Sequence, residues 1–294
     1  MFSILIPTWN NLACLKLCIN SLRRHSAHAH EILIHVNEGS DGTLDWLRSE
    51  GIDFSHSSGN IGICLAVNHL ASQATSEWLV YMNDDMVVAP GWDTALLETI
   101  ERHDSDLIYL SSTLIEPYPS TSPAIQTLDC GAQPTAFDEP RFLSHCARTN
   151  YPNHEGAASQ PSLFSRRWFH MLGGYSLEFS PGMASDDDFL MKLWVAGCRT
   201  FEVVGGSKVY HFSRQSTGRI KNSKGGRTFA MKWGMTLDEF KRDYLARAHA
   251  LKDGGFPHAS VKGRLRRAGY GLFNDYPLAD IEAWSAHPAA RFPR

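Results

Sequence analysis

The chain has 294 residues, enough for one large domain or two small ones, and 43% of them are hydrophobic, which provides for a sizeable core. Its 28 basic and 31 acidic residues give a net charge of −3, which argues against a nucleic-acid-binding surface. The apolar runs are too short for a membrane-spanning helix of about 20 residues. We expect no signal peptide at the start, and the six scattered cysteines predict free thiols in a reducing cytosol rather than a zinc site.

The first 110 or so residues are predicted to alternate between strands and helices. Short apolar runs predict strands at residues 2–7, 31–36, 52–57, 77–82 and 106–112. Periodic apolar positions predict helices at residues 11–25, 43–50, 61–74 and 91–102, and Pro90 suits the first turn of the last one. Strands joined by helices of this length imply right-handed crossovers, and so an α/β fold with a mostly parallel central sheet flanked by helices.

The pattern changes after residue 112. Residues 112–160 are rich in Pro, Ser and Thr and predict long loops of functional importance or mobility. Residues 162–175 predict a helix ended by Gly173 and Gly174, and residues 185–197 predict a second helix. Residues 199–204 and 207–212 are strand-like. A polar, basic segment follows, and then a tail that is first helical and then irregular.

Four polar or glycine-rich segments follow the predicted strands of the first half. They are residues 7–10, 37–41, 59–62 and 83–85. Parallel sheets bind ligands beyond the carboxyl ends of their strands. We therefore expect these four segments to meet on one rim and to form a ligand site.

Asp84 and Asp85 stand side by side at the end of a predicted strand, where their charges repel each other. A hard cation would remove this repulsion, and Mg²⁺ or Mn²⁺ prefers such oxygen ligands together with substrate phosphates. The alternative is an acidic pair before a helix, satisfied by backbone N–H groups. His211, at the end of a later strand, is either a structural histidine or a further metal ligand.

A second acidic cluster, Asp186, Asp187 and Asp188, begins the helix predicted after residue 185. Capping of the helix needs one carboxylate, not three. Crowded like charges raise one another's pKa, which favours a general base. Five basic residues from Arg214 to Arg227 lie in a Gly- and Ser-rich segment, which is either a solvated loop or a lid over phosphates.

Five motifs in this order resemble glycosyltransferase family 2. They are "SILIPTWNNLACLKLCINSL", "VNEGSDGT", "GNIGICLAVNHL", "MNDDMVVAPGW", and "GGYSLEF" with "SDDDFLMKLWVAG". The resemblance covers roughly residues 2–235. It departs from the family pattern at Asn37 and Glu38, which replace an acidic pair, and at Ser185, which replaces a glutamate. That last departure leaves open whether Asp186 or Asp187 is the base.

The resemblance implies a GT-A fold, Rossmann-like, and assigns roles to residues. Those expected at the nucleotide sugar are Pro7, Thr8, Asn10, Asn37, Glu38, Asn60, Gly62, Asn68, Asn83, Asp84, Arg214 and Arg219. Those expected at Mn²⁺ or Mg²⁺ are Asp85 and His211. The catalytic group is Asp186, Asp187 and Asp188, and the acceptor is expected near Gly173 and Gly174.

The resemblance also implies an inverting transfer of a sugar from a UDP-, GDP- or dTDP-linked donor to a hydroxyl of a saccharide or lipid-linked acceptor. Such a reaction serves polysaccharide, glycolipid or other glycoconjugate synthesis. The implied layout is a GT-A domain at residues 1–235 and a helical extension at 236–294. Within the domain, the nucleotide half is about 1–110, the acceptor half about 111–212 and the basic lid about 213–235.

Two other functions use a similar rim. A nucleotidyltransferase usually has a glycine-rich phosphate loop near its first strand, and "IPTWNN" contains no glycine. A non-catalytic protein of the same fold would bind a nucleotide sugar without transferring it. Residues 261–273 mix Lys and Arg with apolar residues, which predicts either a solvated helix or peripheral membrane contact. We expect a cytoplasmic protein, free or at the inner face of the membrane.

Overall fold

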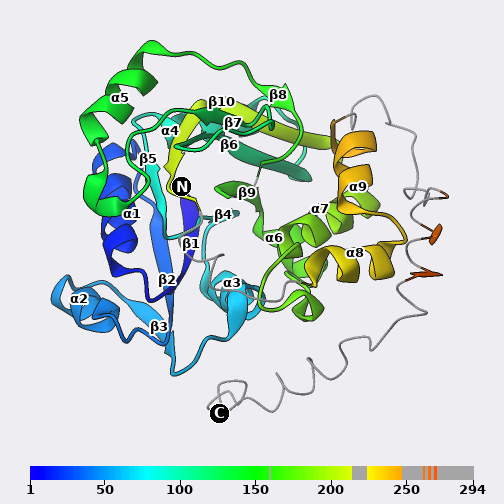
Figure 1. Cartoon of the computed structure of the whole chain (residues 1–294), viewed down its shortest axis with the longest axis horizontal. Coiled ribbons are helices and arrows are strands. Elements are labelled where there is room, and N and C mark those ends of the chain that lie inside the picture. Colours follow the sequence, from blue (N-terminus) through cyan, green and yellow to red (C-terminus); the bar gives the residue numbers. More distant parts are fainter. Residues whose placement is uncertain (159, 214–223, 247–260, 262–263, 266–267, 270–294) are drawn as a thin grey trace.

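The computed structural model describes residues 1–158, 160–213, 224–246, 261, 264–265 and 268–269 (Figure 1). Over residues 2–81, strands and helices alternate as predicted. The strands are β1 (Phe2–Trp9), β2 (Glu31–Asn37), β3 (Phe54–Ser57) and β4 (Trp78–Tyr81). The helices between them are α1 (Leu12–His25), α2 (Thr43–Ser49) and α3 (Gly62–Gln73). The four strands are parallel in the order β3-β2-β1-β4, so their carboxyl ends share one edge.

Beyond β4 the sheet, which is mostly parallel as predicted, also contains antiparallel strands. The strand β6 (Ile108–Glu116) does not pair with β4, because β9 (Ser162–Ser165) lies between them and is antiparallel to both. Next come β10 (Thr200–His211), parallel to β6, and β5 (Met86–Val88), antiparallel to β10. The two strand-like runs predicted at residues 199–212 are one strand, whose register shifts between Val204 and Lys208.

The prediction of a helix at residues 162–175 was wrong for the first four residues. Ser162–Ser165 form β9, and only Arg166–Met171 form the helix α6. The run "SLFS" suits a strand because Leu163 and Phe164 point to opposite faces of the sheet and are both fully buried, each in a different hydrophobic cluster.

Residues 112–160, predicted as long loops, contain the helix α5 (Glu139–Arg148). Asp138 caps it by accepting a hydrogen bond from the backbone of Arg141, and a proline follows in the first turn. Phe142 and Cys146 of this helix pack against the end of β10. Two short strands, β7 (Ile125–Thr127) and β8 (His154–Glu155), pair with β6 and β10, and a short 3₁₀ helix η1 (Pro134–Ala136) precedes α5.

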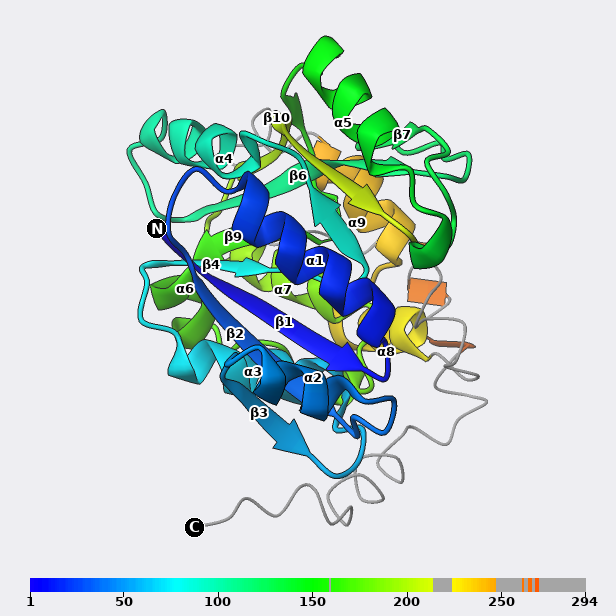
Figure 2. The same ribbon diagram turned by 90° about the vertical axis from the view of Figure 1, so that its left-hand side faces the viewer.

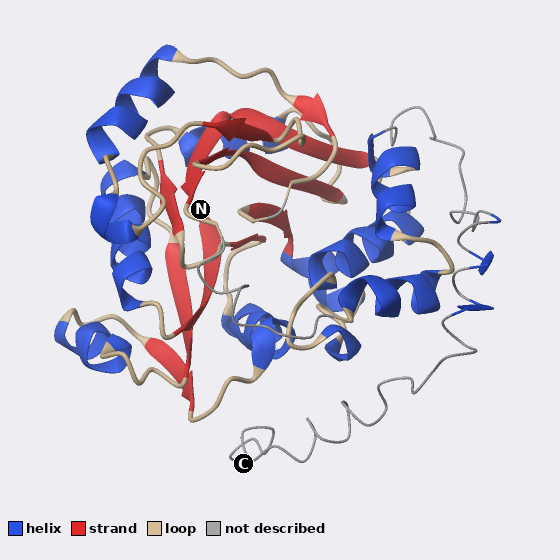
Figure 3. Ribbon diagram, viewed as in Figure 1, coloured by secondary structure: helices blue, strands red, loops and turns tan. Residues whose placement is uncertain are grey.

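Helices cover both faces of the sheet (Figures 2 and 3). On one face, α1 and α4 (Trp92–Glu101) pack against the apolar side chains of β1, β4 and β6. On the other face lie α3 and a C-terminal group consisting of η2 (Leu177–Phe179), α7 (Ser185–Val195), α8 (Gly225–Trp233) and α9 (Leu237–Asp243). The six cysteines are all buried and free, as their spacing predicted.

The segment predicted as a helical extension begins inside the core. Phe240 of α9 and Leu245 are buried against α7, in the cluster that also holds Trp194 and Phe229. Residues 236–246 are therefore packed as part of the main body. Residues 261–273, the predicted membrane-contact segment, fall largely outside the described residues. Within the described part of the chain, no helix is long and apolar enough to cross a membrane.

Candidate active site

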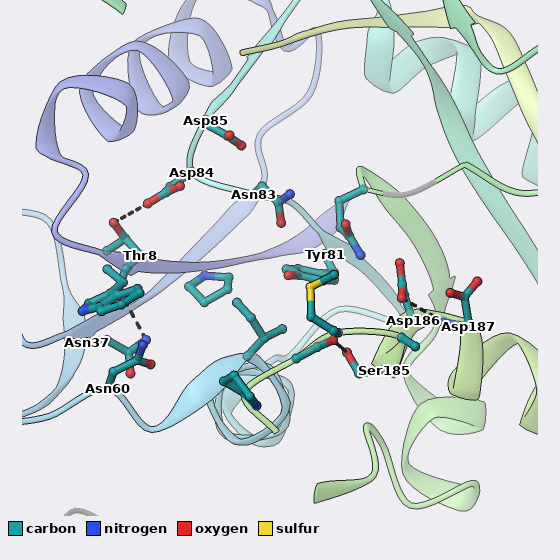
Figure 4. Close-up of a pocket in the computed structure, with 18 of the residues that line it drawn as sticks. Thr8, Asn37, Asn60, Tyr81, Asn83, Asp84, Asp85, Ser185, Asp186 and Asp187 are labelled. Carbon is teal, nitrogen blue, oxygen red and sulfur yellow. Dashed lines mark hydrogen bonds between the residues drawn. The ribbon is translucent and has the colours of Figure 1, made fainter. Parts of the chain in front are cut away.

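A cavity of about 420 Å³ opens at the carboxyl ends of the parallel strands, beside the start of α7 (Figure 4). All four rim segments predicted from the sequence contribute to it. Their lining residues are Pro7, Thr8, Trp9, Asn37, Asn60, Asn83, Asp84 and Asp85. On the other side it is lined by residues of α7 and the turn before it, including Ser185, Asp186 and Asp187. The rule that parallel sheets bind ligands beyond the carboxyl ends of their strands, here called the strand-end rule, thus located the cavity from the sequence.

Asp84 is anchored to the first strand and helix. Its two carboxylate oxygens accept hydrogen bonds from the Thr8 hydroxyl at 2.6 Å and from the Asn11 side-chain amide at 2.9 Å. These bonds offset the cost of burying a carboxylate beside Asp85. The two adjacent aspartates therefore differ, because Asp84 is occupied by protein donors whereas Asp85 points to another part of the cavity (Figure 4).

Two asparagines shape the rim near α3. The Asn37 oxygen accepts from the backbone N–H of Ile61 at 2.8 Å, which ties the end of β2 to the start of α3. The Asn60 oxygen accepts from the backbone N–H of Gly62 at 2.9 Å. Gly62 has φ +78°, and a Cβ there would lie 3.0 Å from the backbone of Pro181. Glycine is needed at this position because the two loops approach so closely.

Asn10 and Glu38, both predicted at the nucleotide, lie outside the lining of the cavity. The Asn10 amide donates to the Glu38 carboxylate at 3.0 Å, and both residues have left-handed backbones with φ of 45° and 62°. Non-glycine residues adopt this conformation rarely, and it concentrates at functional sites. The pair forms a fixed turn after the ends of β1 and β2, next to the cavity.

Asn68, Gly173 and Gly174 are placed away from the cavity lining, contrary to their predicted roles. The Asn68 side chain accepts from the backbone N–H of Tyr175 at 2.7 Å and donates to its carbonyl at 2.8 Å. This pair of bonds fixes the loop between α6 and η2 on α3. The structure therefore supports a role in packing for Asn68 and Gly174.

Gly174→Ala is expected to destabilise the protein by about 3 kcal/mol. Gly174 has φ +61°, and an added Cβ would lie 2.4 Å from the Asn68 oxygen and displace the two buried hydrogen bonds to Tyr175. Gly173→Ala is the matched control, because Gly173 also has a positive φ but has no atom within 4 Å of an added Cβ. It should cost only the backbone strain of about 1 kcal/mol. Equal losses in urea denaturation would contradict this account.

Asp85 and His211 face each other because β5 and β10 are antiparallel neighbours. Met86 pairs with His211, which brings the Asp85 carboxylate within 3.4 Å of the histidine Nε2. The histidine Nδ1 lies 2.7 Å from Glu116, a residue that our sequence analysis missed. Glu116 ends β6, so the strand-end rule could have found it. Burial lowers the pKa of His211, but the two carboxylates outweigh it and raise this pKa to about 10.

Asp85 and His211 fit Mg²⁺ or Mn²⁺ if a substrate supplies the remaining ligands of the ion. Among the described residues, no three His, Cys, Asp or Glu side chains form a ready-made metal cluster. One carboxylate and one imidazole would suffice, since Mg²⁺ is commonly held by one or two carboxylates together with phosphate oxygens. Glu116 would orient the imidazole through its other nitrogen. A cation between Asp85 and His211 would replace the proton that these carboxylates favour on the histidine.

The acidic cluster at the start of α7 divides into two parts. Asp186 and Asp187 line the cavity, on the side opposite Thr8, Asn37 and Asn60 (Figure 4). One oxygen of Asp186 accepts from the backbone N–H of Asp187 at 2.9 Å. Asp187 forms an ion pair with Lys241 of α9 at 2.8 Å. Burial and the neighbouring Asp186 raise the pKa of Asp187 to about 6, and Lys241 opposes this rise.

Asp188 does not line the cavity, which argues against the predicted catalytic role. It is fully buried and accepts hydrogen bonds from the Ser176 hydroxyl at 2.6 Å and the Trp233 indole at 2.8 Å. The ammonium groups of Lys192 and Lys232 lie 3.5 Å and 2.9 Å from it. With four partners in the interior, Asp188 holds α7 and α8 together.

The remaining lining residues separate into those that sequence could have found and those that it could not. Tyr81 ends β4 and lies in Figure 4 between the side with Thr8 and Asn37 and the side with Asp186. The strand-end rule could have included it. Leu237 and Gly226 come from α9 and α8, and only their packing brings them to the cavity. Arg214 and Arg219 fall outside the described residues.

The family assignment rests on a match of the sequence to a family model. The model described as Glycosyl transferase family 2 matches residues 3–172, which is more than half of the chain. The chain belongs to glycosyltransferase family 2. It is also 29% identical over 116 residues to PGL/p-HBAD biosynthesis glycosyltransferases of Mycobacterium bovis and Mycobacterium tuberculosis. That match covers 37% of this chain and 45% of these relatives, so it spans less than half of their length.

Solved structures of similar shape are glycosyltransferases of the GT-A fold. Residues 1–349 of S. aureus TarS in complex with UDP-GlcNAc give a TM-score of 0.56 at 13% identity, covering 91% of this chain and 78% of that one. GalNAc-T7 with UDP, GalNAc and Mn²⁺ gives 0.55 at 14% identity, covering 95% and 58%. At such identities the likeness shows the fold, and the predicted GT-A fold is confirmed.

Proposed function

We propose that the protein is a metal-dependent, inverting glycosyltransferase that moves a sugar from a nucleoside-diphosphate sugar to an acceptor hydroxyl. The observation that carries this proposal is the arrangement of one cavity. The proposed metal-ligand pair, Asp85 and His211, and the carboxylates of Asp186 and Asp187 face the same space from different elements. A cation held by Asp85 and His211 would offset the charge of a diphosphate. Asp186 or Asp187 would supply the base that an acceptor hydroxyl needs.

The donor would lie along the ends of β1, β2 and β4. Pro7, Thr8, Asn37 and Asn60 form this side of the cavity, and Asn10 with Glu38 would contact the base or ribose from the adjoining turn. The solved structures of TarS and GalNAc-T7 contain UDP or UDP-GlcNAc, which supports a nucleotide-sugar donor. We propose a UDP-, GDP- or dTDP-linked hexose or deoxyhexose.

Asp85 and His211 would hold Mn²⁺ or Mg²⁺ at the diphosphate. When bound, the ion offsets the negative charge that builds up on the leaving nucleoside diphosphate. The presence of Mn²⁺ in the GalNAc-T7 structure supports this choice of ion. Arg214 and Arg219 would add cationic groups to the same phosphates.

The transfer itself needs one proton acceptor. Asp186 or Asp187 would take the proton of the acceptor hydroxyl as its oxygen bonds to the anomeric carbon. The bond from that carbon to the diphosphate oxygen breaks on the opposite face, and the nucleoside diphosphate leaves with the electron pair. One displacement inverts the anomeric centre. Donor and acceptor bind together, so no covalent intermediate with the protein is needed.

The acceptor would be a saccharide or a lipid-linked hydroxyl, as in polysaccharide or glycolipid synthesis. The names of the mycobacterial relatives, which place them in PGL/p-HBAD biosynthesis, support a glycoconjugate product. Such acceptors would be met in the cytoplasm or at the inner face of the membrane. Peripheral contact through residues 261–273 belongs to this proposal, and co-sedimentation with anionic liposomes tests it.

A panel of nucleotide sugars with and without Mn²⁺ tests the proposed function. We expect one donor to raise the melting temperature, more so with Mn²⁺, and to release nucleoside diphosphate when an acceptor is present. Release of pyrophosphate from a nucleoside triphosphate and a sugar phosphate, with no release of nucleoside diphosphate from any donor, would instead identify a nucleotidyltransferase. Binding without release, across a range of acceptors, would identify a non-catalytic protein of the same fold.

A further inference from the structure

The helix α9 is fixed in place on the outer side of α7. Its N-terminus has a capping box, in which Thr236 and Glu239 satisfy each other's backbone N–H groups. Phe240 is fully buried, with its ring 5.8 Å from that of Phe229 and 6.5 Å from that of Trp194. A helix held by a cap and a buried aromatic ring presents its other side chains at defined positions.

Two side chains of α9 reach the acidic side of the cavity. Leu237 lines it, and Lys241, one turn later, lies 2.8 Å from the Asp187 carboxylate. Residues i and i+4 share one face of a helix, so both point to α7 from the same face. Neither α7 nor α9 belongs to the residues 3–172 matched by the family model.

We propose that Lys241 is a positioning residue of the transfer reaction, which keeps Asp187 ionised so that Asp186 remains the proton acceptor. This inference rests on the proposed function. Two neighbouring carboxylates in a partly buried site share one proton unless a cation offsets their repulsion. A shared proton would occupy the base that the acceptor hydroxyl needs.

The charged groups around Asp187 fit this role. Asp186 precedes it on α7, and both Lys241 and Asp238 face it from α9. Asp186 and Asp238 favour its protonated form, and Lys241 opposes them. The Asp187 side chain is nearly buried, so the ammonium group acts on it through little intervening water. The Asp186 side chain is less buried than that of Asp187. Its Oδ1 accepts the hydrogen bond from the Asp187 backbone, which leaves Oδ2 to accept a proton.

The first test measures melting temperature between pH 5 and pH 8, and needs no activity. The pKa of Asp187 is about 6 in the folded protein and 3.8 in the unfolded chain. Ionisation of Asp187 therefore costs stability as the pH rises through the window between 3.8 and about 6. Lys241→Met raises this pKa further and widens the window. We expect the variant to melt close to wild type at pH 5 and several degrees lower at pH 8. The double variant Asp187→Asn/Lys241→Met should recover much of that loss.

The second test measures the pH profile of sugar transfer. Lys241→Met should move the ascending limb to higher pH, with a loss about five- to tenfold greater at pH 6 than at pH 8. Lys241→Arg keeps a cation and should restore the wild-type profile. Arg242→Met is the matched control, because it removes the same charge from the next residue of α9. Arg242 pairs with Asp243 instead of Asp187. We expect it to leave both measurements unchanged.

Three results would overturn the proposal in different ways. A Lys241→Met profile parallel to wild type would show that Lys241 has only a structural role, even if the melting temperature falls. An Arg242→Met variant that shifts the limb equally would assign the effect to overall charge. If wild type transfers no sugar from any donor, the proposed function fails and the positioning role with it, whereas the melting curves still report the ion pair.

Discussion

Asp85→Ala is expected to lower the rate of sugar transfer by about a thousandfold or more, since metal stabilisation of a leaving group contributes several kcal/mol and about 4 kcal/mol corresponds to this factor. Asp85 is the carboxylate of the proposed metal pair, 3.4 Å from His211. Asp84 cannot replace it, because Thr8 and Asn11 already occupy its oxygens. The assays are release of nucleoside diphosphate and calorimetric titration with Mn²⁺ in the presence of the nucleotide, and both signals should be lost.

The fold should survive this substitution. Besides its side-chain contact with His211, Asp85 accepts a hydrogen bond at its backbone carbonyl from Phe212 N–H at 3.1 Å, and this bond does not depend on the side chain. Asp104→Ala, at an exposed position, is the control for loss of one surface charge. Full transfer by Asp85→Ala, at unchanged metal dependence, would contradict the assignment of this residue to the metal.

The nucleotide side of the cavity was predictable because its cause is local. A parallel strand that ends in polar residues delivers them to a shared edge, so β1, β2 and β4 place Thr8, Asn37 and Asn83 together whatever the rest of the chain does. The same rule could not separate Asp84 from Asp85. Their difference arises from the side chain of Asn11 and from β10, which returns more than a hundred residues later.

The side of the cavity formed by α7 was less predictable because its contacts are long-range. The run of four residues Ser162–Ser165, buried on both faces of the sheet, gave too little signal to distinguish β9 from the start of a helix. The prolines of residues 112–160 concealed α5, although one of them suits its first turn. Asp186, Asp187 and Asp188 look equivalent in sequence. Contacts of α7 with α8 and α9 separate them, because Lys232 of α8 joins Lys192 of α7 at the buried Asp188, and Lys241 of α9 pairs with Asp187.

Asp186→Asn is expected to lower the rate of transfer by about a hundred- to ten-thousandfold, the range that a positioned general base contributes. An asparagine keeps the oxygen that accepts from the Asp187 backbone, so α7 should begin as before. It cannot take the proton of the acceptor hydroxyl. Mn²⁺ and the nucleotide sugar should bind Asp186→Asn as tightly as wild type, because the residues proposed to bind them lie on the other side of the cavity. Single-turnover kinetics would then locate the loss in the chemical step.

Asp187→Asn separates the two candidate bases. If Asp186 is the base, Asp187→Asn removes a neighbouring negative charge and should transfer sugar far faster than Asp186→Asn. The reverse order would make Asp187 the base and Lys241 a group that acts directly on it. Full activity in Asp186→Asn and Asp187→Asn alike would remove both from the mechanism. The variant Asp85→Ala provides the contrast, since it should lose metal and donor binding, whereas a missing base should slow only the reaction of a fully bound complex.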